Sequence, residues 1–267
     1  MDYSLFYHWD VSPYLINNNI ISIRIYSILF GLGVFFVYFN VVKNFIREKK
    51  GYLEDLLFKS IIIMIVSSRI FHCFFYNFDY YSQNLFEVLI PYNFEKGYFT
   101  GYQGLSSHGG AIGFVLSVIF YGKKKFNKPE ILKILDLAFF YSLILIFLIR
   151  LGNLFNSEIL GKYCTKFFCI VFPSYDNIPR YPAQIIEGLS YLFLFLMIYM
   201  LKERLHFLSK PGFLSLIIVF SVSLIRFFIE FVKLPNTEVD TGLFNIAQYL
   251  TLFISIIIGF IIITRKR

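Results

Sequence analysis

Apolar residues fall in seven long stretches along this chain, and polar residues gather between them. Stretches of roughly 17 to 25 mostly apolar residues are long enough to cross a bilayer as helices. The expected spans are residues 20–42, 60–77, 106–121, 134–152, 183–201, 211–232 and 244–264. The pattern therefore predicts an all-α, polytopic integral membrane protein with about seven transmembrane helices.

The composition supports this class of protein. Of 267 residues, 57% are hydrophobic, 21% are aromatic and only 16% are charged, and the mean hydropathy is +0.65. A soluble globular domain usually carries about 25% charged residues. The start, Met1-Asp2-Tyr3, lacks the basic region of a cleaved signal peptide. We expect a single transmembrane domain over residues 1–267, with segments outside the membrane near 78–105 and 153–182.

The basic residues lie in alternate loops, so the net charge of +8 does not indicate a nucleic-acid surface. One side of the expected spans carries 16 of the 25 Lys and Arg residues, namely Lys43, Arg47, Lys49, Lys50, Lys59, Lys123, Lys124, Lys125, Lys128, Lys133, Lys202, Arg204, Lys210, Arg265, Lys266 and Arg267. The other side carries Lys96, Lys162, Lys166, Arg180 and Lys233. The positive-inside rule places the rich side in the cytoplasm. The N-terminus is then outside and the C-terminus is cytoplasmic.

Four arginines remain within or at the edges of the spans: Arg24, Arg69, Arg150 and Arg226. An arginine near a helix centre costs about 2.5–3.5 kcal/mol on insertion scales, so each requires an explanation. Snorkelling to the headgroup layer would explain any one of them, and Arg24 above all. In the predicted orientation, however, all four lie toward the outer leaflet.

Arginines gathered at one depth repel one another unless anions lie between them. Glu230 follows Arg226 by one turn and could offset one charge through an i, i+4 pair. The planar fork of arginine suits two phosphate oxygens. The sequence therefore predicts an anionic ligand in the outer leaflet, for which a phospholipid headgroup is suitable.

Polar clusters accompany these arginines. At residues 106–113, His108 could titrate near neutral pH and Gly109 would let the backbone approach a ligand, although small residues for helix packing are the alternative interpretation. At residues 150–161, Arg150, Asn153 and Asn156 would share one face if the helix continues that far.

A further cluster opens the span at 183–201. Gln184 and Glu187 stand three residues apart on its outer turn. Because buried polar groups in lipid must be paired, these two are interpreted as groups that orient the arginines.

The order and spacing of these segments closely resemble the bacterial prolipoprotein diacylglyceryl transferase family over nearly the whole chain. The segments are Arg24-Ile25-Tyr26, Ser68-Arg69-Ile70, Phe75-Tyr76-Asn77-Phe78, His108-Gly109-Gly110, Arg150 to Gly161, Pro182-x-Gln184-x-x-Glu187 and Arg226-x-x-x-Glu230. The chain departs from the usual family residues at Ile149, Tyr181, Lys233 and Ala247.

The resemblance implies a transferase of the bacterial cytoplasmic (inner) membrane, multi-pass, with its active site toward the outer leaflet. Such an enzyme moves the diacylglyceryl group of phosphatidylglycerol onto the lipobox cysteine of a prolipoprotein, forms a thioether and releases glycerol phosphate, as the first step of lipoprotein maturation. The implied partners are phosphatidylglycerol, the lipobox peptide and the lipid bilayer, with no nucleic acid. No cofactor or metal is implied, and the sequence contains no glycine-rich phosphate loop and no His/Cys cluster at ligand spacing.

The resemblance also implies roles for residues. The expected catalytic residues are His108, Arg226, Arg150 and Tyr26. The expected substrate-binding residues are Arg150, Arg226, Asn153, Asn156, Glu158, Gly109, Gly161, Arg69, Gln184, Glu187 and Glu230. His108 is either the base that removes the thiol proton or a hydrogen-bond donor to the headgroup.

Two other functions remain as alternatives, an anion transporter or channel lined by the arginines and an intramembrane acyltransferase with a histidine base. A transport path would need polar residues toward the cytoplasmic side, and the inner halves of four spans contain almost none. Cys164 and Cys169 lie in an outer segment and could form a disulfide in an oxidising compartment.

Overall fold

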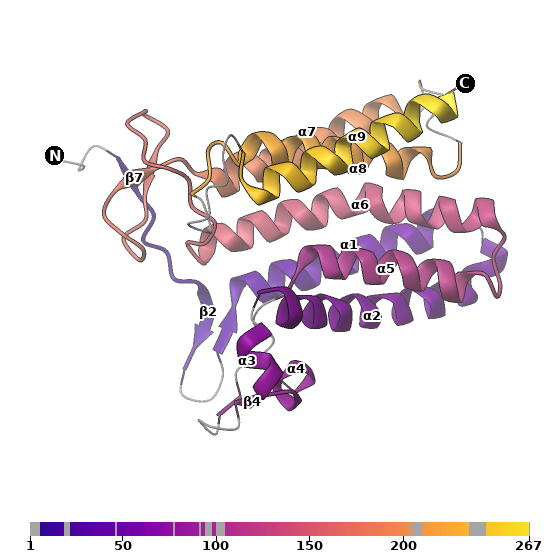
Figure 1. Ribbon diagram of the computed structural model, residues 1–267, viewed down its shortest axis with the longest axis horizontal. Helices are drawn as coiled ribbons and strands as arrows, with labels where there is room; N and C mark the ends of the chain where they lie inside the picture. The colour runs from indigo at the N-terminus through magenta and orange to yellow at the C-terminus, as the bar shows by residue number, and fades with distance from the viewer. Residues whose placement is uncertain are drawn as a thin grey trace. The chain divides into compact units, whose positions relative to one another are not determined.

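The computed structural model describes residues 6–18, 22–45, 47–76, 78–90, 92–93, 98–99, 105–202, 204, 210–234 and 244–266 (Figure 1). Asn77 of the expected motifs, and Lys96 and Arg267 of the charge pattern, lie outside these residues. The longer helices are α1 (Ile25–Asn44), α2 (Lys50–Tyr76), α5 (Ser107–Gly122), α6 (Lys128–Phe155), α7 (Ala183–Leu201), α8 (Phe213–Ile229) and α9 (Ile246–Lys266). The shorter elements are η1 (Arg47–Lys49), α3 (Phe78–Gln83), α4 (Phe86–Leu89), β1 (Tyr7–His8), β2 (Tyr14–Asn17), β3 (Ser22–Arg24), β4 (Tyr92–Asn93), β5 (Tyr98–Phe99), β6 (Ile170–Val171) and β7 (Pro179–Arg180).

Each expected span coincides with one long helix. Within the described part of the chain, five helical segments are long and apolar enough to cross a membrane: Ile25–Asn44, Arg47–Phe75, Lys128–Phe155, Ala183–Leu201 and Ala247–Thr264. The helices Ser107–Gly122 and Phe213–Ile229 are apolar but shorter. The prediction of an all-α polytopic membrane protein is confirmed, whereas the number of seven spans and the orientation stay predictions.

Three helix starts differ from the expected ones by five residues or more, and one of them is that of α6, which was expected at residue 134 and begins at Lys128. The first span was expected from residue 20, but α1 begins at Ile25 because residues 22–24 pair with residues 14–17 in an antiparallel ribbon. The second was expected from residue 60, but α2 begins at Lys50. Its first turns are amphipathic, and i, i+4 ion pairs support them: Lys59 Nζ lies 2.6 Å from Asp55, and Lys50 Nζ lies 3.7 Å from Glu54.

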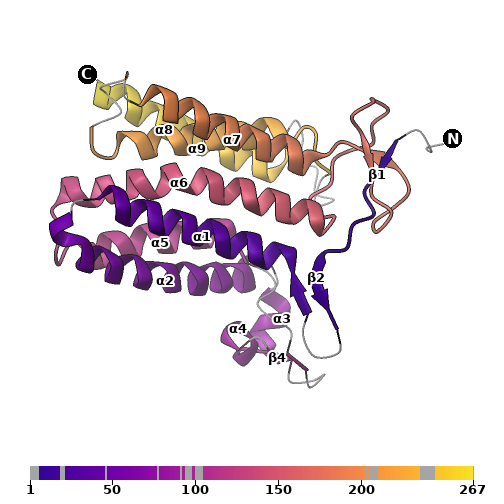
Figure 2. The ribbon, with the colours of Figure 1, turned by 180° about the vertical axis from the view of Figure 1, so that it is seen from behind.

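The chain divides into two compact units, and the boundaries lie within α1 and α6. The first unit comprises Met1–Val41 and Asp136–Arg267, and the second comprises Val42–Leu135. In the first unit, α7, α8 and α9 lie side by side (Figures 1 and 2). A Cβ on Gly33 of α1 would lie 2.5 Å from the Leu145 side chain and 3.1 Å from the Leu145 Cα of α6, so glycine favours the close approach of these helices.

A buried carboxylate fixes the start of α8 in the first unit. Asp136 of α6 accepts hydrogen bonds from the backbone N–H groups of Gly212 and Ser215, each at 2.7 Å. These donors have no partner within a helix, and the helix dipole favours a negative charge there. Asp136 therefore ties two apolar helices together at their polar ends.

In the second unit, α2 runs alongside α5 (Figure 2). The contact depends on glycines one turn apart on α5. A Cβ on Gly109 would lie 2.8 Å from the carbonyl oxygen of Ser67, and one on Gly113 would lie 2.6 Å from the Cβ of Ser67. Small residues at this spacing allow two helices in a membrane to pack closely.

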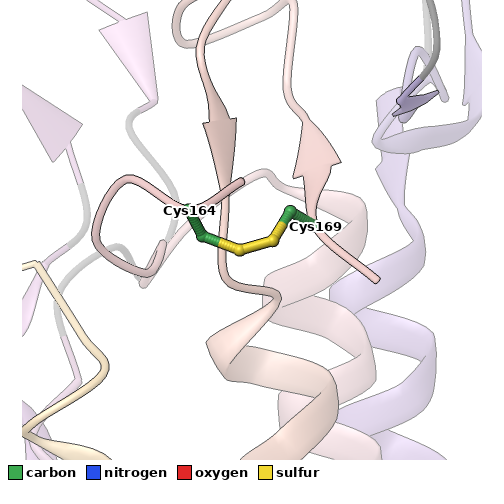
Figure 3. The surroundings of a disulfide bond; sticks show 2 residues. All are labelled: Cys164 and Cys169. Carbon is green, nitrogen blue, oxygen red and sulfur yellow. A yellow bond between two sulfur atoms is a disulfide. The ribbon is translucent and has the colours of Figure 1, made fainter. Parts of the chain in front are cut away.

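A small sheet forms beyond the helices of the first unit. Strand β1 pairs in parallel with β6, and β6 pairs antiparallel with β7. A disulfide joins Cys164 to Cys169, whose Cα atoms are 6.1 Å apart (Figure 3). Both cysteines are buried.

Arg180 of β7 holds the same segment through Asp176. Its Nε lies 3.1 Å from Oδ1 and 3.0 Å from Oδ2 of Asp176, and its Nη2 also contacts Oδ2. These hydrogen bonds lower the pKa of the Asp176 carboxyl below its ordinary value of 3.8. A carboxyl whose pKa is lowered by folding stabilises the fold above the unfolded pKa, and it loses this effect as the pH falls through the folded pKa.

Asp176→Asn is therefore expected to lower the free energy of unfolding by about 1–2 kcal/mol at pH 7 and to have little effect well below pH 3.8. Thermal unfolding of the purified protein in detergent at both pH values measures this. Asp55→Asn, which removes an exposed pair with Lys59, serves as the control and should change little. Equal melting temperatures of wild type and Asp176→Asn at pH 7 would contradict the prediction.

Candidate active site

Arg150 lies in the last turns of α6 and is buried. Its Nη1 donates to Asn153 Oδ1 at 3.0 Å, and its Nη2 donates to Glu187 Oε1 at 2.8 Å. Gly188 of α7 allows α6 to lie close, because a Cβ there would make a tight contact of 3.2 Å with the Cβ of Arg150. The guanidinium is thus held on two sides by side chains from two helices.

Arg226, in the last turn of α8, shares the same carboxylate. Its Nη1 lies 3.7 Å from Glu187 Oε1, a distance that suits an ion pair but is too long for a hydrogen bond. The side chain of Arg226 is 24% exposed, compared with 8% for Arg150 and 0% for Glu187. Two guanidiniums therefore face one carboxylate, and the cluster carries a surplus positive charge on its more exposed side.

Tyr191 completes this cluster. Its hydroxyl donates to Glu187 Oε1 at 2.7 Å, and the side chain is fully buried. Sequence reasoning did not single out Tyr191. Its position one turn after Glu187 on the same helix face was the signal that could have found it.

Glu230 does not pair with Arg226 as its spacing predicted. It accepts instead from Lys233 Nζ at 2.7 Å and from Asn245 Nδ2 at 3.2 Å. The helix ends at Ile229, and the following backbone turns back to pair with residues 160–162. This turn brings Lys233 to Glu230, so the ion-pair partner of Arg226 is Glu187 on α7, and Glu230 acts on it only from a greater distance.

The polar turn after α6 gathers further expected residues. The helix is assigned up to Phe155, and the backbone N–H of Asn156 still donates to the carbonyl oxygen of Gly152 at 3.1 Å, so Asn156 follows Asn153 in the last helical turn. Glu158 links the two amides, accepting from Asn153 Nδ2 at 3.1 Å and from Asn156 Nδ2 at 3.3 Å. Positive φ angles at the residues on either side of Glu158, 52° at 157 and 58° at 159, bend the chain into this position.

Gln184 and Gly161 stabilise this turn. Gln184 Nε2 donates to the carbonyl oxygen of Glu158 at 2.5 Å, and Gln184 is fully buried. A Cβ on Gly161 would lie 2.3 Å from the carbonyl oxygen of Tyr181, so glycine is required for the close backbone contact there. Gly161 thus packs against protein backbone.

Tyr26 belongs to the same unit and packs against α6. A Cβ on Gly152 would lie 2.6 Å from Cδ2 of Tyr26, so the ring occupies the space that this glycine leaves free. Gly152 is two residues beyond Arg150 on the helix. Tyr26 therefore lies beside the turn that carries the arginine and its amides.

Arg69 lies in the second unit and binds backbone carbonyl oxygens. Its Nε donates to the carbonyl oxygen of Val88 at 3.2 Å, and its Nη2 donates to that of Glu87 at 2.9 Å. Its guanidinium also lies 4.9 Å from the ring centre of Tyr81. Arg69 is 4% exposed and fastens the segment around α4 to α2.

His108 is the second residue of α5 and is half-buried. Ser106 caps this helix and is itself held by Ser68 of α2 through two hydrogen bonds, at 3.1 and 2.7 Å. The preceding helix α2 thus fixes the backbone that carries His108. Gly109 is buried against Ser67 and Phe71, which supports the helix-packing interpretation of this glycine.

The expected site residues therefore fall into two groups. The first unit brings together Tyr26, Arg150, Asn153, Asn156, Glu158, Gly161, Gln184, Glu187 and Arg226, with Glu230 in the turn after α8. The second unit holds Arg69, His108 and Gly109. Over the described ranges, no three His, Cys, Asp or Glu side chains gather in a way that would hold a metal ion.

Long apolar helices, one group of which ends in a buried cluster of two arginines and a carboxylate, define a polytopic membrane protein. The sequence model of the family described as prolipoprotein diacylglyceryl transferase matches residues 13–265. The chain belongs to this family, and it is an enzyme, a diacylglyceryl transferase.

Several bacterial relatives share most of the chain. The phosphatidylglycerol–prolipoprotein diacylglyceryl transferase of Bacteroides fragilis is 34% identical over 253 residues, which cover 92% of this chain and 90% of the relative. The proteins of the same name from Chloroherpeton thalassium and Chlamydia caviae are 32% and 31% identical, and the matches cover 98% and 88% of this chain and 95% and 86% of the relatives.

Proposed function

We propose that this enzyme transfers the diacylglyceryl group of phosphatidylglycerol to the lipobox cysteine of a prolipoprotein. The thiolate sulfur attacks the glyceryl carbon that carries the phosphate ester. A carbon–sulfur bond forms as the carbon–oxygen bond breaks, and the electron pair leaves with glycerol phosphate. The names of the relatives support both substrates for this chain.

The observation that carries this proposal is the arrangement of Arg150 and Arg226 around one carboxylate. Negative charge builds up on the phosphate as it leaves, and donors that are already oriented stabilise such charge best. Arg150 is oriented by Asn153 and Glu187. Arg226 is the more exposed of the two and is held less tightly, so it can turn toward a phosphate oxygen.

The thiol must also lose its proton. A free cysteine has a pKa of about 8.5, so only a few per cent is thiolate at neutral pH. We assign the proton to His108, whose backbone is fixed by the capped start of α5. Tyr26 contacts the headgroup, and Glu158 with the two asparagines keeps the arginine in position.

We place the site toward the outer leaflet of the bacterial inner membrane, with seven spans, the N-terminus outside and the C-terminus in the cytoplasm. The distribution of Lys and Arg supports this orientation. The disulfide between Cys164 and Cys169 also supports it, because disulfides persist in oxidising compartments.

Labelling of single cysteines tests this orientation. A cysteine at Ser107, which is exposed at the start of α5, is expected to react with a membrane-impermeant thiol reagent added outside. A cysteine at Lys124, which is exposed beyond the other end of that helix, is expected to react only after the membrane is opened. Both variants lack the three native cysteines. The reverse pattern would overturn the orientation and the outer-leaflet site.

The activity is tested with purified protein, phosphatidylglycerol and a lipobox peptide. We expect a thioether-linked diacylglyceryl peptide and one glycerol phosphate released for each peptide modified. Label in the glycerol backbone of the lipid should appear on the peptide. Transfer of label from an acyl chain without the backbone would instead support the acyltransferase alternative.

A further inference from the structure

The first unit contains buried hydrogen-bond acceptors without partners at the start of α7 and in the turn after α6. Among the described residues, Glu187 Oε2, Gln184 Oε1 and Asn156 Oδ1 are buried side-chain oxygens with no hydrogen-bond partner. Glu187 and Gln184 are both 0% exposed. Buried polar atoms in native proteins are almost always paired, so an unpaired group indicates a ligand or an ordered water.

The contacts of Glu187 and Gln184 show which atoms are available. Gln184 Nε2 donates to a backbone carbonyl at 2.5 Å, so its nitrogen must face that oxygen and Oε1 is the end without a partner. Glu187 uses Oε1 for Arg150, Arg226 and Tyr191, which leaves Oε2. The two residues stand three apart on α7 and therefore share one face of the helix.

These oxygens require donors, whereas the neighbouring arginines require an anion. A ligand that suits both carries a phosphate together with neutral hydroxyl groups. An ammonium headgroup also has donors, but it would face the guanidiniums of Arg150 and Arg226, and a trimethylammonium headgroup has no donors at all. A hydroxyl donates to Oε1 and Oε2 without adding positive charge.

We propose that Glu187 Oε2 and Gln184 Oε1 accept hydrogen bonds from the hydroxyl groups of the lipid headgroup and so select a glycerol headgroup. This inference rests on the proposed function and adds to it the residues that determine headgroup specificity. Glu187 thereby has two roles, one oxygen orienting the arginines and the other reading the headgroup.

The test compares two soluble probes that differ in hydroxyl groups, glycerol 1-phosphate and ethyl phosphate. Their binding to the delipidated protein in detergent is measured by isothermal titration calorimetry. The wild type is expected to bind glycerol 1-phosphate about tenfold more tightly than ethyl phosphate, since each new hydrogen bond contributes about two- to tenfold. Equal binding of the two probes by the wild type would overturn the proposal.

Variants test whether Gln184 Oε1 and Glu187 Oε2 accept the hydrogen bonds from the headgroup. Gln184→Met keeps the approximate shape of the side chain and removes the acceptor Oε1 together with the Nε2 donor to the carbonyl oxygen of Glu158, so it should reduce the preference to about threefold or less; binding of ethyl phosphate, measured alongside, reports the effect of the lost donor on the arginine site. Thr251→Val is the matched control, because Thr251 is buried in the same unit and bonds only within its own helix. It should retain the wild-type preference.

Glu187→Gln is the second variant, for the case that Gln184→Met does not fold. It replaces one oxygen by a donor and removes the internal anion, so the preference should fall while ethyl phosphate binds more tightly. An unchanged preference in either folded variant would show that the oxygens hold buried water only. Transfer assays separate the two proposals. If the wild type forms the thioether and the variants keep the preference for glycerol 1-phosphate, this inference alone is overturned. If the variants lose that preference but the wild type forms no thioether, the proposed function alone is overturned.

Discussion

Arg150→Lys is expected to lower turnover by on the order of 10²–10³-fold although the positive charge remains. The two Nη atoms of Arg150 bond to different partners, Asn153 Oδ1 and Glu187 Oε1, at 3.0 and 2.8 Å. A single lysine ammonium on a longer, flexible stem cannot reproduce this fork. The change leaves Glu187 with a poorer partner and lets Arg226 shift away from the position proposed to bind the phosphate.

The measurement is the initial rate of glycerol phosphate release at saturating lipid and peptide. Arg180→Lys is the matched control, because Arg180 is also a buried arginine paired with a carboxylate in the same unit. It should lower thermal stability and leave turnover within about threefold of wild type. Near-normal turnover of Arg150→Lys would remove Arg150 from the catalytic site.

The second large effect is expected at His108. If this imidazole accepts the thiol proton, His108→Gln should lower turnover by about 10²–10⁴-fold near pH 7. Raising the pH toward 9 should restore part of the rate, because the substrate thiol then ionises without help. The pH dependence of turnover in wild type and variant measures this directly.

His72→Gln is the control for His108, because His72 is another half-buried histidine of the same unit. It should keep the pH profile of the wild type. A deficit in His108→Gln that is the same at pH 7 and pH 9, and that appears as weaker lipid binding, would assign His108 to the headgroup. That result would leave the transferase activity in place.

The structure also distinguishes Arg69 of the second unit from Arg150 of the first unit, although both were expected to bind the substrate. Arg69 and Arg150 have the same sequence context, because each lies in the later half of a long apolar span. Arg69 binds the carbonyl oxygens of Glu87 and Val88 and therefore holds a neighbouring segment. Arg150 binds a shared carboxylate next to a second guanidinium, which suits an anion site.

The sequence by itself determined the class of protein, the approximate positions of the helices and the family. These follow from local properties, because a long apolar run in a membrane must pair its backbone N–H and C=O groups with one another, and a helix does so within the run itself. The span at 183–201 was predicted with the bounds that α7 has in the structure. The polar clusters at 150–161 and 184–187 were also visible, since polar residues in apolar surroundings are rare.

Only the tertiary structure decided which of these groups are partners. It paired Arg226 with Glu187 on another helix, whereas spacing alone had paired it with Glu230. It placed Glu158, in the turn after α6, between the amides of Asn153 and Asn156. Partners of this kind are set by how closely helices approach, as at Gly188 beside Arg150, and by how the chain turns after each helix. Neither quantity follows from the local pattern of residues, because both depend on segments far apart in the sequence.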